Sequence, residues 1–315
     1  MKIQAVEGAR IVFDMPFAEY LADPALSRSE LLDLMHSPRG YYALHRAPNR
    51  PPPKPPTPAQ LVGVLCHCIT LEPHAVLQRF CVKPAGIDLR TNTGKAWAAG
   101  VPPGVEVISD EQMMIAEAQR EALRKHGEMG SFLEHPDARG EVSLFWTDAR
   151  TGVRCKARID LLVPAESDSG VRMVVIDLKT ARDVSPAEFA KDAANYAYDV
   201  QAAFYTEAVE RCTGVDVSAF SFAAVSASFP FLLQVYTIDD ERIALEDARQ
   251  LMGVGLTLYA QCDRFDLWPV FGESAQELLL PPYVHSKRQD EVTRIARLAD
   301  YVRREATLTE GSNDE

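Results

Sequence analysis

Apolar residues recur with two different periods along this chain, and the two periods predict two kinds of element. Short runs rich in valine, isoleucine, leucine and phenylalanine, bounded by turn residues, are typical of strands. Such runs lie at residues 11–13, 141–147, 153–163, 173–178, 220–226 and 231–238. Longer segments with apolar residues three or four positions apart predict helices. They lie at residues 27–37, 59–71, 109–127, 131–136, 185–191, 196–212, 239–259 and 290–304. The two sets together predict an α/β fold with a central mixed β-sheet flanked by helices.

Several helix starts carry capping signals. Ser27 or Ser29 can cap the first helix, and Ser109 followed by Glu111 predicts a capped start for the third. Pro186 fits the first turn of a helix that begins at Ser185. Residues 80–110 show no sustained period, so we expect irregular structure or short strands there.

The chain predicts one large domain over residues 1–285, followed by a short C-terminal extension. Residues 48–58 (PNRPPPKPPTP) are too rich in proline for a helix or a strand interior, so we expect an extended connector within the domain. In residues 286–315, the amphipathic helix suits packing or oligomerisation, and the acidic tail is expected to be disordered.

Composition indicates an ordinary globular protein, with 47% hydrophobic and 25% charged residues. No apolar run reaches the ~18–20 residues that cross a bilayer, and the acidic N-terminus does not resemble a signal peptide. The six cysteines lack disulfide or zinc-site spacing, which favours a reducing compartment. We therefore expect a cytoplasmic protein without membrane association.

Candidate chemistry lies in residues 156–180, which predict two strands joined by a polar turn at residues 166–170. Asp160 and Asp177 interrupt the apolar runs, and a buried acid is costly unless it is paired or bound to a metal. Asp177 and Lys179 share a face because strand side chains alternate. Two carboxylates, with the Leu178 carbonyl, can hold Mg²⁺ or Mn²⁺ while the lysine orients a water for phosphodiester hydrolysis. The alternative interpretation is a buried Asp–Lys ion pair beside a surface acid.

Several segments, in the same order, resemble the RecE-like (exonuclease VIII-type) recombination exonucleases of phages and prophages. Asp160 followed by Asp177-Leu178-Lys179 resembles the PD-(D/E)xK nuclease signature. The matching segments are SRSELLDLMHSPRGYY (27–42), GVLCHCITLEP (63–73), RTNTGKAW (90–97), KARIDLL (156–162), VVIDLKT (174–180) and YAYDVQAAFY (196–205). The resemblance implies a restriction-endonuclease-like core and Mg²⁺-dependent DNA degradation.

The resemblance also implies further site residues, each with a plainer alternative. His67, four residues after Gly63, belongs to the active site in this family, although it is otherwise a satisfied core histidine. Glu141 is implied near the metal, or is simply a strand-edge acid. Gln201 and Tyr205 lie on one helix face and resemble the Q-x-x-x-Y motif that contacts substrate or orders the lysine; otherwise they are half-buried polar residues.

The implied function is a metal-dependent exonuclease that degrades linear double-stranded DNA from the 5′ end and leaves 3′ single strands for recombination. A ring-like homo-oligomer and a single-strand annealing partner are implied with it. A RecB-type single-strand nuclease and a non-cutting DNA-binding recombination module remain open. The net charge of −12 is unusual for a DNA-binding protein. Basic residues at 39–50, together with Arg90, Thr91, Lys95 and Trp97, can contact DNA or merely decorate the surface.

Overall fold

The computed structural model describes residues 4–52, 54–167, 170–238, 243–270, 278, 288–289 and 291–297. Contacts divide the chain into one unit at Met1–Pro269 and another at Val270–Glu315. The predicted domain boundary at residue 285 and the acidic tail lie outside the described residues. Within the predicted C-terminal helix, residues 291–297 are helical.

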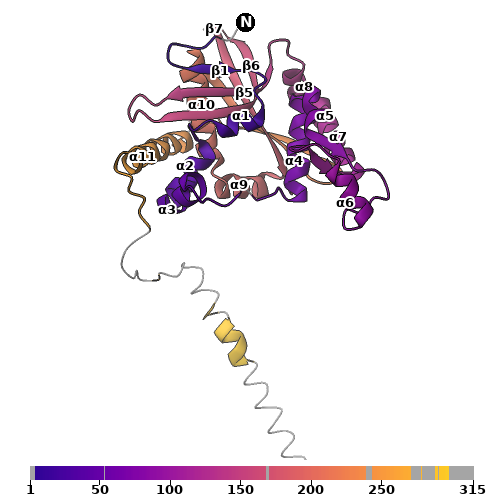
Figure 1. The fold of residues 1–315 in the computed structure, drawn as a ribbon. Helices are drawn as coiled ribbons and strands as arrows, with labels where there is room; N and C mark the ends of the chain where they lie inside the picture. Colours follow the sequence, from indigo (N-terminus) through magenta and orange to yellow (C-terminus); the bar gives the residue numbers. More distant parts are fainter. Residues whose placement is uncertain are drawn as a thin grey trace, which may run out of the picture. The chain divides into compact units, whose positions relative to one another are not determined.

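A seven-stranded sheet forms the centre of the first unit (Figure 1). Its strands are β1 (Arg10–Val12), β2 (Leu26–Ser27), β5 (Arg139–Thr147), β6 (Arg154–Ser167), β7 (Gly170–Ala181), β8 (Val217–Ser226) and β9 (Leu233–Ile238). The order is β1-β5-β6-β7-β8-β9, with β2 beside β6. Within the described part of this sheet, only the β7–β8 and β2–β6 pairs are parallel. The predicted mixed sheet in an α/β fold is confirmed.

Helices cover both faces of this sheet. They are α1 (Phe17–Ala22), α2 (Arg28–His36), α3 (Pro38–Tyr41), the π-helix η1 (Tyr42–Arg46), α4 (Pro58–Leu71), the 3₁₀-helix η2 (Pro73–Ala75), α5 (Val76–Arg79), α6 (Asn92–Ala99), α7 (Asp110–Lys125), α8 (Gly127–Leu133), α9 (Pro186–Asn195), α10 (Tyr198–Thr213) and α11 (Ile243–Phe265). Helices α2, α10 and α11 bury Leu34, Phe204 and Met252 in one core. Helices α4 and α7 bury Leu65 and Ala116 in the other. Two covered faces explain why the central strands read as nearly continuous apolar runs.

The connection from β7 to β8 brings two helices, α9 and α10, to the sheet. Because these two strands are parallel, the chain must cross over between their ends, and α9 and α10 make that crossover. Pro186 stands at the first position of α9 after Ser185, as the sequence predicts. Helix α10 is thereby laid along the sheet with its N-terminal turn near the end of β7.

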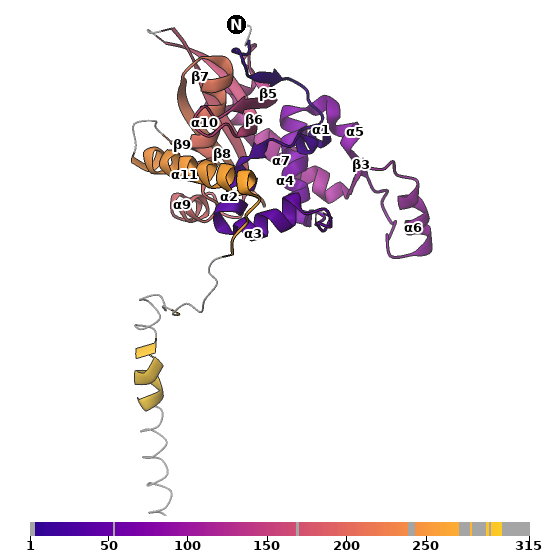
Figure 2. The ribbon, with the colours of Figure 1, turned by 60° about the vertical axis from the view of Figure 1, so that its left-hand side comes forward.

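Residues 80–110 contain short strands, as the sequence predicts, but also a helix, α6, that it does not predict. The side chain of Thr91 caps it by accepting from the amide of Gly94, and Gly94 lies so close to the Asp88 carbonyl that no Cβ would fit. Strands β3 (Phe80–Val82) and β4 (Glu106–Ile108) pair in parallel at the base of this segment. Figure 2 shows α6 standing away from the sheet. The local cap and close backbone contact, which periodicity does not report, explain the missed helix.

Two other helix starts differ in detail from the sequence expectation. Ser109 caps α7, but its capping-box partner is Gln112, in place of Glu111. Helix α8 begins at Gly127, earlier than expected, because the ring of His126 accepts a hydrogen bond from the Met129 amide. Both differences arise from side-chain contacts to backbone amides.

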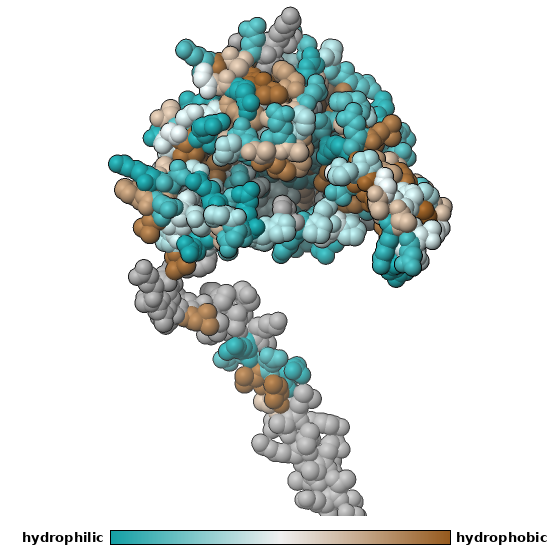
Figure 3. Space-filling view, in the orientation of Figure 1, coloured by the Kyte–Doolittle hydropathy of each residue, from teal (hydrophilic) through white to brown (hydrophobic). Residues whose placement is uncertain are grey.

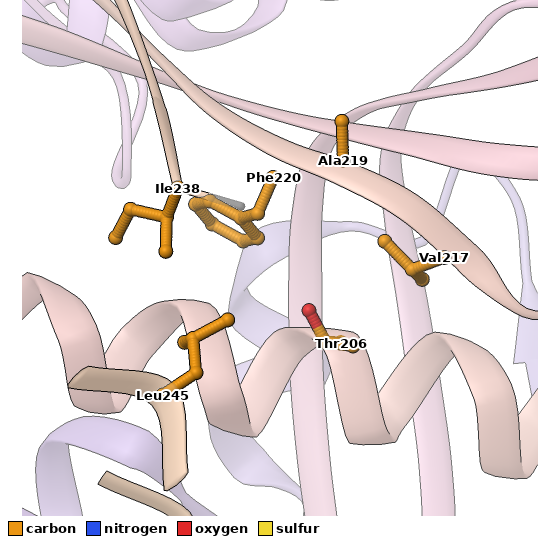
Figure 4. Close-up of a pocket in the computed structure, with 6 residues that line it drawn as sticks. All are labelled: Thr206, Val217, Ala219, Phe220, Ile238 and Leu245. Carbon is orange, nitrogen blue, oxygen red and sulfur yellow. The ribbon is translucent and has the colours of Figure 1, made fainter. Parts of the chain in front are cut away.

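A small apolar cavity lies between α10, β8, β9 and α11 (Figure 4). Its volume is about 10 Å³, at the lower limit for one water molecule. It is lined by Thr206, Val217, Ala219, Phe220, Ile238 and Leu245. This lining offers no set of titratable groups, so we regard the cavity as a packing gap.

Within the described part of the chain, no single helix is both long and apolar enough to cross a bilayer. Helix α4 together with Pro73–Arg79 meets the length and hydropathy requirements only as a pair bent by 120°.

Candidate metal and catalytic site

Asp160 and Glu141 lie where the regular pairing of the central strands is interrupted. Strands β5 and β6 pair in one unbroken register on both sides of these two residues, which lie opposite each other, but the two residues themselves are not paired. Glu141 has a left-handed φ of 51°, which is uncommon outside glycine. Ile159 and Leu161, which would share a face in a regular strand, pack into opposite cores. Strand β6 therefore changes face at Asp160, and such irregularities re-aim side chains.

The carboxylate of Asp160 bonds to a backbone amide of the neighbouring strand β7, in the manner of a main-chain carbonyl. It accepts a hydrogen bond of 2.8 Å from the Leu178 amide in β7. The Nδ1 atom of His67, on α4, lies 3.5 Å from the same Oδ2 atom, and its ring also hydrogen-bonds to the Leu178 backbone. One donor atom each from His67, Glu141 and Asp160 lies within 4.8 Å of the others. An imidazole and two carboxylates can hold a divalent cation.

Asp177 and Lys179 form a second group on the adjacent strand. The Nζ atom of Lys179 makes an ion pair with Oδ2 of Asp177, whose side chain is 3% exposed. Gln201, from the second turn of α10, joins both residues. Its amide Nε2 donates to Oδ1 of Asp177, and its Oε1 accepts from Lys179 at 3.2 Å. The lysine also lies over the rings of Tyr198 and Phe222, at 4.9 and 5.8 Å from their centroids. Its ammonium group is therefore held in one place by charge, amide and aromatic contacts.

Crowding of acids shifts the proton affinity of Asp160. Burial raises the pKa of Asp160 well above its ordinary value of 3.8, and the nearby charges of Asp177 and Glu141 raise it further. Partial burial lowers the pKa of His67, which favours the neutral imidazole that binds metals. A divalent cation would relieve the repulsion among these acids without requiring a proton.

Tyr205 lies one helical turn beyond Gln201 and packs against Phe220 with ring centroids 6.3 Å apart. Burial raises the pKa of its phenol well above 10, and the charges of Asp177 and Asp160 act in the same direction. Tyr205 therefore stays protonated at neutral pH, as a hydrogen-bond donor.

Gly63 allows α4 to approach β7 closely. A Cβ atom at this position would lie 2.9 Å from Oγ1 of Thr180, the residue after Lys179. His67 follows one turn later on the same helix, so this close approach sets how near the imidazole comes to Asp160.

Arg28 is a site neighbour that we did not predict from the sequence. Its Nη2 atom donates to the carbonyls of Tyr196 and Ala197, the second at 2.6 Å, and so ties α2 to the start of α10. Asp177 and Tyr205 are among its electrostatic neighbours. A basic residue in the first turn opposes the helix dipole. That mismatch was the available signal for a role outside the helix.

The structure thus brings the predicted residues into two adjoining groups. His67, Glu141 and Asp160 form the first, with the Leu178 backbone between them, and Asp177, Lys179 and Gln201 form the second. Among the described residues, Tyr205 makes no hydrogen bond to either group, but it lies close enough to feel the charges of Asp177 and Asp160.

Comparisons with known proteins bear on the family and the fold of the chain. The family described as "PDDEXK-like domain of unknown function (DUF3799)" matches residues 27–279. A crystal structure described as a "Putative exonuclease" from Eubacterium rectale has a TM-score of 0.56 at 14% identity, over 86% of this chain and 95% of that one. Protein VC1899 from Vibrio cholerae has 13% identity over 82% of this chain and 58% of that one, with a TM-score of only 0.23. No curated protein matches.

Proposed function

Because the chain belongs to the PDDEXK-like family and so to the PD-(D/E)xK nuclease superfamily, we propose that it is a metal-dependent DNA exonuclease. One observation carries the proposal: the donor group of His67, Glu141 and Asp160 adjoins a lysine fixed by Asp177 and Gln201. A structural ion pair alone would not require the three further donors beside it.

The donor group suits Mg²⁺ or Mn²⁺. Carboxylate oxygens are preferred by both ions, and an imidazole ligand is more compatible with Mn²⁺. Asp160, Glu141 and His67 would hold the cation, with Asp177 and the Leu178 carbonyl beside them as further candidate ligands. The cation supplies Lewis acidity, which polarises the phosphodiester and eases deprotonation of water.

The protein side chains would position and stabilise the reacting groups. Lys179 can donate to a phosphate oxygen or orient the attacking water from the position that Asp177 and Gln201 define. Tyr205 can donate a hydrogen bond at neutral pH but cannot act as a base, because its phenol keeps its proton. Gln201 fixes the lysine and lies too deep, at 5% exposure, to reach a bulky substrate directly.

For the substrate we propose linear double-stranded DNA, degraded from the 5′ end to leave 3′ single strands for recombination. The resemblance of residues 27–205 to RecE-like exonucleases supports this choice, and the description of the Eubacterium rectale protein as an exonuclease supports exonucleolytic cleavage alone. A ring-like homo-oligomer and an annealing partner, both implied by the RecE-like resemblance, belong to the same proposal. Exposed Leu251 and Val254 on α11, on a side where Figure 3 shows hydrophobic residues, support self-association. Light scattering tests it: a monomer at micromolar concentration would contradict the oligomer.

Polarity is tested with linear duplexes labelled at either the 5′ or the 3′ end, incubated with Mg²⁺ or with chelator. We expect early release of the 5′ label in Mg²⁺ alone. Early release of the 3′ label would reverse the polarity, and activity only on single strands would favour the RecB-type alternative. A mobility shift without any loss of DNA would favour a non-cutting binding module and contradict the nuclease.

A further inference from the structure

Arg158 lies in the interior between the segments that carry the proposed metal ligands. Its side chain is 7% exposed, and each of its nitrogens has a partner. Nε donates to Oε2 of Glu141, and Nη2 donates to Oε1 of Glu72 at 3.1 Å. Nη1 donates to the Met15 carbonyl at 2.7 Å and to Oγ of Ser143 at 3.3 Å. A planar guanidinium with five donors can fix several partners at once.

Arg158 contacts one member of the donor group and is linked to the other two through Glu72 and through strand β6. It holds Glu141 directly. It holds Glu72, the residue that ends α4, and His67 lies five residues earlier on that helix. Asp160 is two residues further along the same strand, β6. Glu72 is itself anchored on its other oxygen by Arg79, at 2.9 Å. The charged chain from Arg79 through Glu72 and Arg158 to Glu141 therefore ends at the metal-binding group.

We propose that Arg158 is a positioning residue, which fixes one oxygen of Glu141 and the end of α4 so that Glu141, His67 and Asp160 converge on one cation. The inference rests on the proposed function, since it assigns the geometry of the same metal site. Glu141 needs such a constraint because its backbone is in the left-handed region and is not paired with β6 at that point, where a long side chain has several orientations. A carboxylate has two oxygens, so the one that Arg158 binds leaves the other to face the cluster.

The test measures Mn²⁺ binding by calorimetry and by the paramagnetic resonance signal of free Mn²⁺, without DNA. Arg158→Lys keeps the positive charge but replaces the fork with a single ammonium group. We expect its dissociation constant for Mn²⁺ to rise about tenfold or more, the usual effect of losing a group that orients a ligand. Glu72→Gln, which weakens only the anchor of α4, should give a smaller rise.

Lys156 supplies a matched control on the same strand. It is buried two residues before Arg158, but its Nζ contacts the carbonyls of Tyr20, Leu21 and Asp23 in place of carboxylates. Lys156→Met should lower the melting temperature and leave the Mn²⁺ dissociation constant unchanged. Circular dichroism establishes that each variant is folded.

The outcomes separate this inference from the nuclease proposal. Wild-type affinity in folded Arg158→Lys, or an equal loss in Lys156→Met, would overturn the positioning role while the nuclease stands. If Arg158→Lys does not fold, Glu72→Gln becomes the test. An unchanged Mn²⁺ affinity in that variant would then overturn the positioning role of Arg158. A wild-type chain that degrades DNA in Mg²⁺ but binds no Mn²⁺ would overturn this inference and leave the nuclease activity standing. A chain that neither binds Mn²⁺ nor degrades DNA would overturn both.

Discussion

The carboxylate of Asp160 illustrates how one residue can be costly for folding and useful for chemistry. It is nearly buried, it accepts the Leu178 amide, and it faces two other acids. The raised pKa means that the folded state without metal binds a proton at Asp160 more tightly than the unfolded state does. The stability without metal therefore falls as pH rises above about 4, through the range up to the raised pKa.

Asp160→Asn removes the cost of burying a charged carboxylate beside two other acids. It keeps an oxygen that can accept the hydrogen bond from the Leu178 amide. In chelator at pH 7 we expect the variant to melt higher than the wild type, by about 2–4 °C for each kcal/mol relieved. Mn²⁺ should raise the melting temperature of the wild type and leave that of the variant nearly unchanged. Differential scanning calorimetry measures both effects. A variant that melts lower in chelator would show that Asp160 is not strained by its neighbours.

Gln201 offers a second test at the scale of single side chains. Gln201→Leu keeps the volume but removes both the donor to Asp177 and the acceptor from Lys179. Because the lysine then loses one of its anchors, we expect kcat to fall about 10–100-fold with a small change in KM. Steady-state hydrolysis of a labelled duplex measures this. Cys212→Ser, further along the same helix, is the control, and an equal fall in both variants would point to a general effect on α10.

At the scale of elements, the sequence predicted what depends on local pattern. The runs at residues 141–147 and 173–178 are strands because both sheet faces are buried, and their apolar content shows it. The change of face at Asp160 was not predictable, because it depends on pairing with two neighbouring strands. Arg28 and its partner Tyr196 are 168 residues apart in the sequence. The only local sign of this contact is the unfavourable position of a basic residue in the first turn of α2. The D-x-K spacing and the Gln201–Tyr205 spacing could be interpreted from the sequence, because each pair lies within one strand or one helix.

The packing of α4 on β7 supplies a prediction about elements. Gly63→Ala places a methyl group 2.9 Å from Oγ1 of Thr180, so α4 must move or the threonine must rotate. We expect kcat to fall about tenfold, through displacement of His67, with a loss of about 1–3 kcal/mol in the free energy of unfolding. Adding Thr180→Ala to this variant removes the obstructing atom. The double variant should regain most of the lost kcat and most of the lost free energy of unfolding. Failure of the double variant to recover activity, while Thr180→Ala alone remains active, would contradict this account.

At the scale of the whole molecule, the net charge of −12 raises the question of where DNA would bind. The segment from Lys83 to α6 offers one answer. It carries Lys83, Arg90 and Lys95 against the single acid Asp88, which Arg90 pairs, and α6 stands clear of the sheet (Figure 2). A local basic excess on a projecting element can bind phosphates even when the whole chain is acidic.

Lys95→Glu tests this assignment, because Lys95 is exposed on α6. We expect the dissociation constant for a duplex to rise about threefold to tenfold near 0.1 M salt, with a shallower salt dependence, by about one unit of log–log slope. Lys125→Glu, an equally exposed charge reversal on α7, is the control. Fluorescence anisotropy measures both variants. Equal weakening by both would indicate only the general charge of the molecule.

The central claim is that Lys179 performs chemistry beside a cation held by His67, Glu141 and Asp160, and Lys179→Ala tests it most directly. The measurement is release of acid-soluble nucleotides from linear duplex DNA, in Mg²⁺ and in chelator, together with the shift in melting temperature on adding Mn²⁺. We predict that the wild type releases nucleotides only with the metal. We predict that Lys179→Ala loses about 100-fold or more of this rate while keeping its Mn²⁺ shift. Degradation by Lys179→Ala at the wild-type rate, or wild-type activity that survives the chelator, would contradict the account.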